Sequence, residues 1–153
     1  MILVTLGTQK QDFSRLLKYI EESSINDEII VQAGYTKFNS KKMKIFDFIS
    51  YEEMNEYIKK ADLIITHSGT GSVLTPLKLG KKVIVCSRLS KYGEHVDDHQ
   101  TQLTEVLKDA GYILELDENI KLDDLIKNID KFKPIKYKSN NDEFIRKLKN
   151  EID

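Results

Sequence analysis

The sequence contains a single cysteine, Cys86, among its 153 residues. One thiol cannot form a disulfide within the chain, so a fold held together by internal disulfides is excluded. Cys86 follows the apolar run Val83–Val85, a setting more typical of a small core residue than of a nucleophile. The scarcity of cysteine fits a reducing compartment, and we expect a cytoplasmic protein.

The sequence also has no excess of either charge. It carries 24 basic and 25 acidic side chains, which give a formal net charge of -1. Such a chain has no overall positive field that would attract DNA, RNA or an anionic membrane. We therefore expect no nucleic-acid partner.

Long apolar runs are missing as well. No stretch approaches the ~20 residues that a membrane-spanning helix requires, and the apolar start Met1–Val4 is not preceded by a basic region. We expect a chain that is neither secreted nor membrane-spanning. Its length suits one domain, which at this size buries roughly 70% of the surface of the unfolded chain.

Short β-branched runs alternate along the chain with stretches whose apolar residues recur at helical spacing. This alternation predicts an α/β fold with a parallel sheet, and the apolar strands indicate helices on both faces. Ser50 and Glu53 have the spacing of a capping box, which predicts a helix that begins at Tyr51. The predicted strands are 2–6, 28–32, 44–48, 63–66, 83–86 and 112–115.

The composition changes near residue 133. Pro134 is followed by a polar stretch, 136–141, and apolar residues then return at helical spacing from Phe144 to Ile152. We therefore divide the chain into a domain over 1–132 and a linker with a C-terminal helix over 133–153. The apolar side of that helix suits either its own domain or a partner.

A first chemical signal follows the opening strand, where Gly7, Thr8 and Gln9 lead into the region of the first helix. A glycine there lets the backbone approach a ligand closely, and the start of a helix has free N–H groups that suit a phosphate. The alternative is a tight turn capped by Thr8.

A second signal of the same kind follows the strand 63–66, in the run His67-Ser68-Gly69-Thr70-Gly71-Ser72. With Ser72 as the N-cap, Pro76 is tolerated in the first turn and Gly80 ends the helix. The run matches neither a P-loop nor a dinucleotide fingerprint. Two glycine-hydroxyl turns at the carboxyl ends of parallel strands nevertheless favour a phosphorylated ligand.

A third signal is the polar stretch 87–100, which is longer than a connection in a compact domain usually needs. His95 and His99 are spaced i, i+4, so a zinc site with His67 or Asp98 as a third ligand is one interpretation. A solvated helix start is another. We favour a loop that binds sugar hydroxyls.

These motifs together resemble the donor-binding half of glycosyltransferase family 28. The similarity rests on Gly7-Thr8-Gln9, Phe48-Ile49, the run 67–72 and the run 93–100, in this order, and extends to about Leu116. The chain is similar to small bacterial capsule and exopolysaccharide subunits, and to the catalytic subunit of the eukaryotic two-part dolichol-linked N-acetylglucosamine transferase. The resemblance implies the Rossmann-like C-terminal half of a GT-B enzyme.

The resemblance also implies roles for individual residues. It places Gly7, Thr8 and Gln9 near the diphosphate, and Phe48 and Ile49 against the uracil. Around the phosphates it places Ser68, Gly69, Thr70, Gly71 and Ser72, and at the donor sugar Glu94, His95, Asp98, His99 and Gln100. Thr75 stands where many relatives have an acidic residue that holds the ribose, so ribose binding here is expected to be weaker or to use Glu94.

The implied activity is inverting hexosyl transfer from a UDP-sugar to a lipid-linked saccharide, in exopolysaccharide or capsule synthesis. A membrane-associated partner subunit would bind the acceptor and supply the general base, with His95 an outside candidate, and would hold the chain at the inner face of the plasma membrane. No Asp-x-Asp motif is present, so we expect no metal or cofactor. A regulatory nucleotide-sugar-binding module and a free-standing α/β hydrolase remain open, as does the identity of the sugar.

Overall fold

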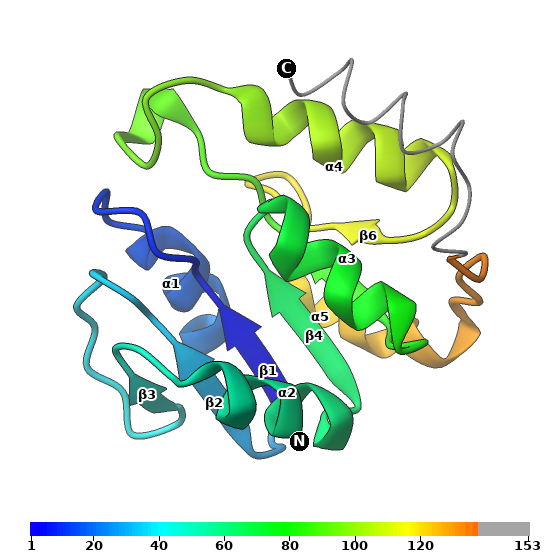
Figure 1. Ribbon diagram of the computed structural model, residues 1–153, viewed down its shortest axis with the longest axis horizontal. Helices are drawn as coiled ribbons and strands as arrows, with labels where there is room; N and C mark the ends of the chain where they lie inside the picture. Colours follow the sequence, from blue (N-terminus) through cyan, green and yellow to red (C-terminus); the bar gives the residue numbers. More distant parts are fainter. Residues whose placement is uncertain (138–153) are drawn as a thin grey trace.

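The computed structural model describes residues 1–137, which form one parallel sheet covered by helices on both faces (Figure 1). The predicted α/β class is confirmed, and each of the six predicted strands is present, some with shorter ends. The strand order is β3-β2-β1-β4-β5-β6. The strands are β1 (Ile2–Thr5), β2 (Ile29–Gln32), β3 (Lys44–Phe46), β4 (Leu63–Thr66), β5 (Val83–Val85) and β6 (Leu114–Glu115).

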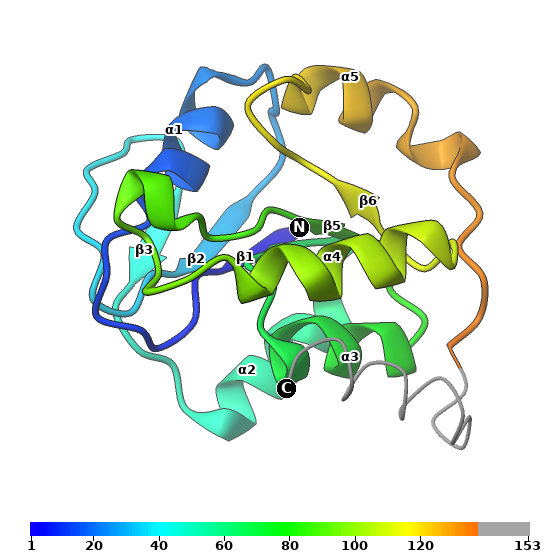
Figure 2. The same cartoon turned by 90° about the horizontal axis from the view of Figure 1, so that it is seen from above.

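Two layers of helices bury the two faces of the sheet (Figure 2). Alternate residues of a strand point to opposite faces, so Val4 packs in the core under α1 and α5, whereas its neighbour Leu3 packs in the core under α2, α3 and α4. The α-helices are α1 (Ser14–Glu22), α2 (Tyr51–Lys60), α3 (Thr70–Lys78), α4 (His99–Asp109) and α5 (Leu122–Lys127). Two 3₁₀ turns are η1 (Ser90–Tyr92) and η2 (Ile129–Lys131).

Cys86 lies in the first of these cores and is fully buried. Burial disfavours the thiolate and raises the pKa of its thiol to about 12. The interpretation of Cys86 as a core residue is confirmed. Within residues 1–137, no helix is long and apolar enough to cross a membrane.

The start of α3 differs from the sequence prediction. Gly69, in an extended conformation, is the N-cap, and Val73 N donates to Gly69 O at 3.0 Å, so the helix begins at Thr70 rather than after Ser72. Gly71 therefore belongs to the helix and not to the loop. Pro76 lies in the helix interior, where its missing N–H leaves the Ser72 carbonyl without a helical donor. Gly80, with φ +74°, follows the helix end as predicted.

Two further helix starts differ from interpretations that the sequence allowed. The helix α1 does not follow Gly7 directly, because residues 6–13 form a loop and Phe13 is the N-cap. Its first N–H groups are already used: Phe13 N donates to Thr36 Oγ1 and Ser14 N donates to Asp12 Oδ2. His95 and His99 do not share a helix, since α4 begins only at His99.

The last described residues extend along the domain. Ile135 N donates to Gly111 O at 3.0 Å, and the buried Tyr137 ring packs edge-on against Tyr112 with 5.7 Å between ring centroids. The C-terminal helix expected over 144–152, and with it most of the 133–153 segment, lies outside the described residues.

The predicted start of α2 at Tyr51 is confirmed, and the capping role of Ser50 can be tested directly. Ser50 Oγ accepts from Glu53 N at 3.1 Å. Ser50→Ala should therefore lower the free energy of unfolding in urea by about 1 kcal/mol, whereas Ser50→Asp, which can also cap, should remain within about 0.5 kcal/mol of the wild type. Equal losses in both variants would contradict a capping role.

Candidate functional site

The candidate site lies at the carboxyl edge of the sheet, between β1 and β4. These neighbouring strands pair in parallel, and the chain leaves them for opposite faces, to α1 and to α3 (Figure 2). Ligands of open parallel sheets bind at such a point, where the strand order reverses. The structure brings the two predicted glycine turns together here, because Gly7 and Gly69 both lie against the ring of His67.

His67 fills the space between the two turns. A Cβ atom on Gly7 would come within 2.6 Å of the imidazole, and one on Gly69 within 2.4 Å, so both positions require glycine. The ring is 5% exposed. Its Nδ1 lies 3.2 Å from Gln100 Nε2, and its Nε2 lies 3.1 Å from Ser72 Oγ. Burial, and after it the neighbouring Arg88 and His95, lowers the pKa of His67 to about 3, so the ring is neutral near pH 7.

Gln100 links this ring to the loop after β5. The Oε1 atom accepts from Ser68 N at 3.1 Å and from Arg88 N at 3.0 Å. The side chain is 6% exposed. Its sugar-binding role stays a prediction; the geometry places its polar atoms against the protein, where they hold two loops together.

Arg88 is a fully buried charge beneath the same loops. Its guanidinium donates to Leu6 O at 2.6 Å, to Gln11 O at 2.7 Å and to Glu94 O at 2.9 Å, and it lies 4.9 Å from the centre of the Phe13 ring. Burial lowers the pKa of Arg88 to about 10, which still leaves it charged near pH 7. It joins the loop after β1 to the loop after β5.

Glu94 is also buried, contrary to its expected place at the ligand. Its carboxylate accepts from Arg15 Nε at 2.9 Å and Nη2 at 3.0 Å, and from Leu89 N at 3.0 Å. At 2% exposed, Glu94 is a structural partner of Arg15 and does not face solvent, so it is not available to the ribose in this arrangement.

His95 and Gln9 contact each other between the loop after β5 and the loop after β1. Gln9 Nε2 lies 2.9 Å from His95 Nε2, and Asp97 Oδ1 lies 3.1 Å from His95 Nδ1. Gln9 Oε1 is buried with no hydrogen-bond partner among the described residues, as is Ser68 Oγ. Two polar atoms without protein partners at one edge suit a polar ligand.

The remaining predicted sugar residues are at the surface. Asp98 Oδ1 accepts from Ser90 N and Ser90 Oγ, and these bonds lower the pKa of Asp98. The His99 side chain is 57% exposed and its Nδ1 lies 3.5 Å from Asp97 Oδ2. Of the two, His99 is the side chain that remains free to reach a ligand.

The predicted uracil and ribose residues lie on the neighbouring loops. Phe48 is 54% exposed and meets the Tyr35 ring edge-on at 5.3 Å, with the partly buried Ile49 beside it in sequence. Thr75 lines a hollow of about 150 Å³ between α2 and α3. Thr8 and Thr70 are exposed.

Sequence reasoning missed several polar side chains of this edge. Gln32, at the end of β2, donates to Gly7 O and Asp47 O, and Thr5 Oγ1 donates to Thr66 Oγ1 at 2.6 Å. Tyr51 and Asn55 line the hollow beside Thr75. The available signal was the polar residue that ends each of the apolar strands β1, β2 and β4.

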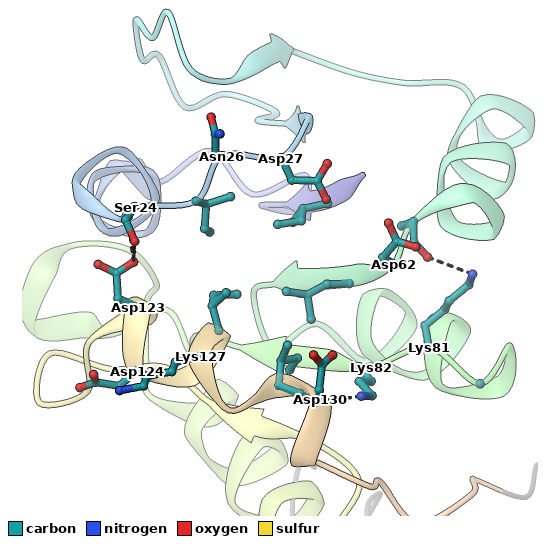
Figure 3. Close-up of a pocket in the computed structure, with 17 residues that line it drawn as sticks. Ser24, Asn26, Asp27, Asp62, Lys81, Lys82, Asp123, Asp124, Lys127 and Asp130 are labelled. Carbon is teal, nitrogen blue, oxygen red and sulfur yellow. Dashed lines mark hydrogen bonds between the residues drawn. The ribbon is translucent and has the colours of Figure 1, made fainter.

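A larger hollow of about 870 Å³ lies at the opposite, amino edge of the sheet (Figure 3). Both of its lysines nearest the sheet are bound within the protein: Lys81 Nζ donates to Lys59 O and Ala61 O, and Lys82 Nζ donates to Ile129 O. The carboxylate of Asp123 accepts from Ser24. This hollow joins structural elements and is not where parallel sheets bind ligands.

Metal ligation was one interpretation of the histidines. Across residues 1–137, no three His, Cys, Asp or Glu side chains come together as a metal ion would require. His95 instead contacts Gln9, and His67 contacts Gln100 and Ser72.

The strand order and the site at its switch point define a Rossmann-like α/β domain, of the kind that forms the C-terminal half of GT-B glycosyltransferases. Residues 1–152 match the glycosyltransferase family 28 C-terminal domain, and the chain belongs to that family. The resemblance in the motifs is therefore confirmed at the level of the family.

Similar proteins carry related names. The UDP-N-acetylglucosamine transferase subunit ALG13 of Saccharomyces cerevisiae is 37% identical over 73 residues, which cover 47% of this chain and 34% of that protein. The Candida glabrata protein of the same name is 30% identical over 128 residues, 82% of this chain and 61% of its own length. The match thus spans between about a third and three fifths of these relatives.

Solved structures share the fold. An NMR structure of ALG13 superposes with a TM-score of 0.62 at 23% identity and covers 96% of this chain and 94% of that one. The glycosyltransferase SnogD of Streptomyces nogalater superposes with a TM-score of 0.60 at 16% identity, over 99% of this chain and 39% of its own.

The lowered pKa of His67 predicts how stability depends on pH. Between about pH 6.5 and 4.5 a histidine of the unfolded chain takes up a proton while folded His67 stays neutral. The unfolded state then binds more protons, so the free energy of unfolding should fall with acidification, by up to about 1.4 kcal/mol per pH unit. Urea unfolding of His67→Gln should show a smaller slope.

The pH range from 6.5 to 4.5 separates the effect of His67 from that of the aspartates. The lowered pKa values of Asp62, Asp98 and Asp123 affect stability at more acidic pH, because their ordinary value is 3.8. A His67→Gln protein with the same slope as the wild type between pH 6.5 and 4.5 would contradict a buried neutral histidine.

Proposed function

We propose that the chain is the donor-binding catalytic subunit of a two-component inverting glycosyltransferase, which transfers a hexose from a UDP-sugar to a lipid-linked saccharide. The observation that carries the proposal is the start of α3 at the switch point: the helix has no side-chain cap, and Ser72 lies in its first turn. The free N–H groups of such a helix start favour a diphosphate. Membership of family 28 supports a sugar-nucleotide ligand.

The proposed chemistry follows from these donors. Negative charge grows on the UDP leaving group as the glycosidic bond breaks, and N–H and hydroxyl donors fixed in advance stabilise that charge. Gly7 and Gly69 leave room for the His67 ring between the two turns, and we propose that the diphosphate lies beside these turns, with Thr8, Thr70, Gly71 and Ser72 around it. Because these donors suit the diphosphate by themselves, we propose binding without a divalent metal or other cofactor.

Nucleoside binding is assigned to the loops beside this edge. Phe48 and Ile49 are proposed to contact the uracil, and Thr75 the ribose, next to the hollow between α2 and α3. A threonine gives a single hydrogen bond where a carboxylate would give two, and Glu94 is held by Arg15. Ribose recognition is therefore proposed to be weak.

The acceptor side is assigned to a partner. We propose a membrane-associated subunit that binds the acceptor, supplies the general base and holds this chain at the inner face of the plasma membrane, in exopolysaccharide or capsule synthesis. His95 Nε2 faces Gln9, which makes it a poor candidate for the base in this arrangement. The subunit names of the ALG13 relatives support the partner, and their UDP-N-acetylglucosamine makes that sugar nucleotide the first donor to test.

UDP binding tests the proposal. Calorimetry with UDP and excess chelator should show binding to the wild type and a loss of roughly 100-fold or more in Gly69→Val, because the new Cβ collides with the His67 ring and displaces the turn that begins α3. Gly80→Val is the matched control at the other end of α3, where the added Cβ meets no atom within 4 Å and strains only the backbone. Undiminished UDP affinity in Gly69→Val would contradict the assigned site.

His99 tests the sugar end. Its exposed imidazole is the predicted sugar contact that is free to reach a ligand, so His99→Ala should weaken UDP-N-acetylglucosamine binding about fivefold and UDP binding by less than about twofold. The same calorimetry measures both. Equal losses for the two ligands would show that His99 serves the nucleotide or the fold.

A further inference from the structure

A chain of three polar side chains runs beneath the glycine turns, from Gln100 through His67 to Ser72. The two links are 3.2 Å, between Gln100 Nε2 and His67 Nδ1, and 3.1 Å, between His67 Nε2 and Ser72 Oγ. Gln100 and His67 are both more than nine-tenths buried. Packing of the core does not explain these contacts, because apolar side chains would fill the same buried space without the free-energy cost of burying polar groups.

The donor and the acceptor of both hydrogen bonds among Gln100, His67 and Ser72 follow from the contacts of Gln100. Gln100 Oε1 accepts from two backbone N–H groups, those of Ser68 and Arg88, which fixes the amide orientation. The NH₂ group of Gln100 therefore faces His67 and donates to Nδ1. A nitrogen that accepts carries no proton, so the neutral ring of His67 holds its proton on Nε2.

The proton on Nε2 then determines what Ser72 can do. His67 donates to Ser72 Oγ, and a hydroxyl that accepts one hydrogen bond keeps its own hydrogen to donate elsewhere. Ser72 is the third residue of α3 and is partly exposed, among the first N–H groups of the helix. Its hydroxyl is therefore presented as a donor at a place where a phosphate oxygen would accept.

We propose that His67 is a positioning residue, which holds the Ser72 hydroxyl as a hydrogen-bond donor to the diphosphate of the sugar nucleotide while itself remaining neutral and Nε2-protonated. This inference rests on the proposed function. It explains why a histidine occupies the space that excludes a Cβ from both Gly7 and Gly69: the ring connects Gln100, at the start of α4, to Ser72, in the first turn of α3.

A pair of nearly isosteric variants separates this role from a merely structural one. The amide of glutamine reaches about as far as the Nε2 of histidine, whereas that of asparagine reaches only as far as Nδ1. Calorimetry with UDP should show a loss of about tenfold for His67→Asn and for Ser72→Ala, and less than about twofold for His67→Gln. The double variant of His67→Asn and Ser72→Ala should lose no more than either single one.

Equal losses in His67→Asn and His67→Gln, or additive losses in the double variant, would overturn the proposal and indicate direct contact of the imidazole with the phosphate. Thermal melting identifies any variant that fails to fold, and Ser72→Ala still tests the donor if His67 tolerates no change. A wild-type chain that binds no UDP would refute the proposed function instead.

The protonation of His67 can be measured without any ligand. Nitrogen-15 NMR of the imidazole in the wild-type chain should show the Nε2-protonated neutral form from pH 5 to 8, with Arg88 and His95 as the electrostatic neighbours of the ring. Gln100→Ala should shift the ring toward a mixture of the two neutral forms, because the donor to Nδ1 is lost. A proton on Nδ1, or a charged ring at pH 7, would refute this arrangement whatever the UDP experiments show.

Discussion

The buried guanidinium of Arg88 is the constraint on which the geometry of the carboxyl edge depends. A charge removed from water costs several kcal/mol unless its donors are paired. The two terminal nitrogens of Arg88 donate to carbonyl groups of Leu6, Gln11 and Glu94, while its buried Nε has no partner among the described residues. Those carbonyls belong to the loop after β1 and the loop after β5. Because the charge must keep these partners, the two loops keep one position relative to each other.

Fixed loops give the edge its chemical character. Gln100 bridges the loop after β4 to the loop after β5, and His67 fills the space beneath the glycines, so the side chains around the switch point have little freedom left. Donors that do not have to reorganise are the kind that stabilise charge in a transition state. The same rigidity makes the edge sensitive to a single added methyl group at Gly7 or Gly69.

The two edges of the sheet are used differently. At the amino edge of the sheet, Lys81 and Lys82 donate to backbone carbonyls of neighbouring elements, and Asp123 accepts from Ser24, so these charges stabilise the fold. At the carboxyl edge Gln9 Oε1 and Ser68 Oγ are buried without partners among the described residues. The size of a hollow is therefore a poorer guide to a ligand than the hydrogen bonds its lining leaves unmade.

The sequence by itself determined the α/β class, the six strands, the start of α2 at Tyr51 and the two glycine turns. Each of these depends on residues that are near one another in the chain. The class and the strands follow from the spacing of apolar residues, the start of α2 from its serine cap, and the turns from glycine, which has no side chain. It did not determine the start of α3, where Gly69, which lies against the ring of His67, is the N-cap in place of Ser72. Only the tertiary structure decided that Glu94 and Gln100 face inward, because their partners Arg15, Ser68 and Arg88 come from other segments. The sequence does not distinguish a polar loop residue that contacts a ligand from one that contacts a buried arginine. Which of the two contacts forms depends on how distant segments of the chain pack together.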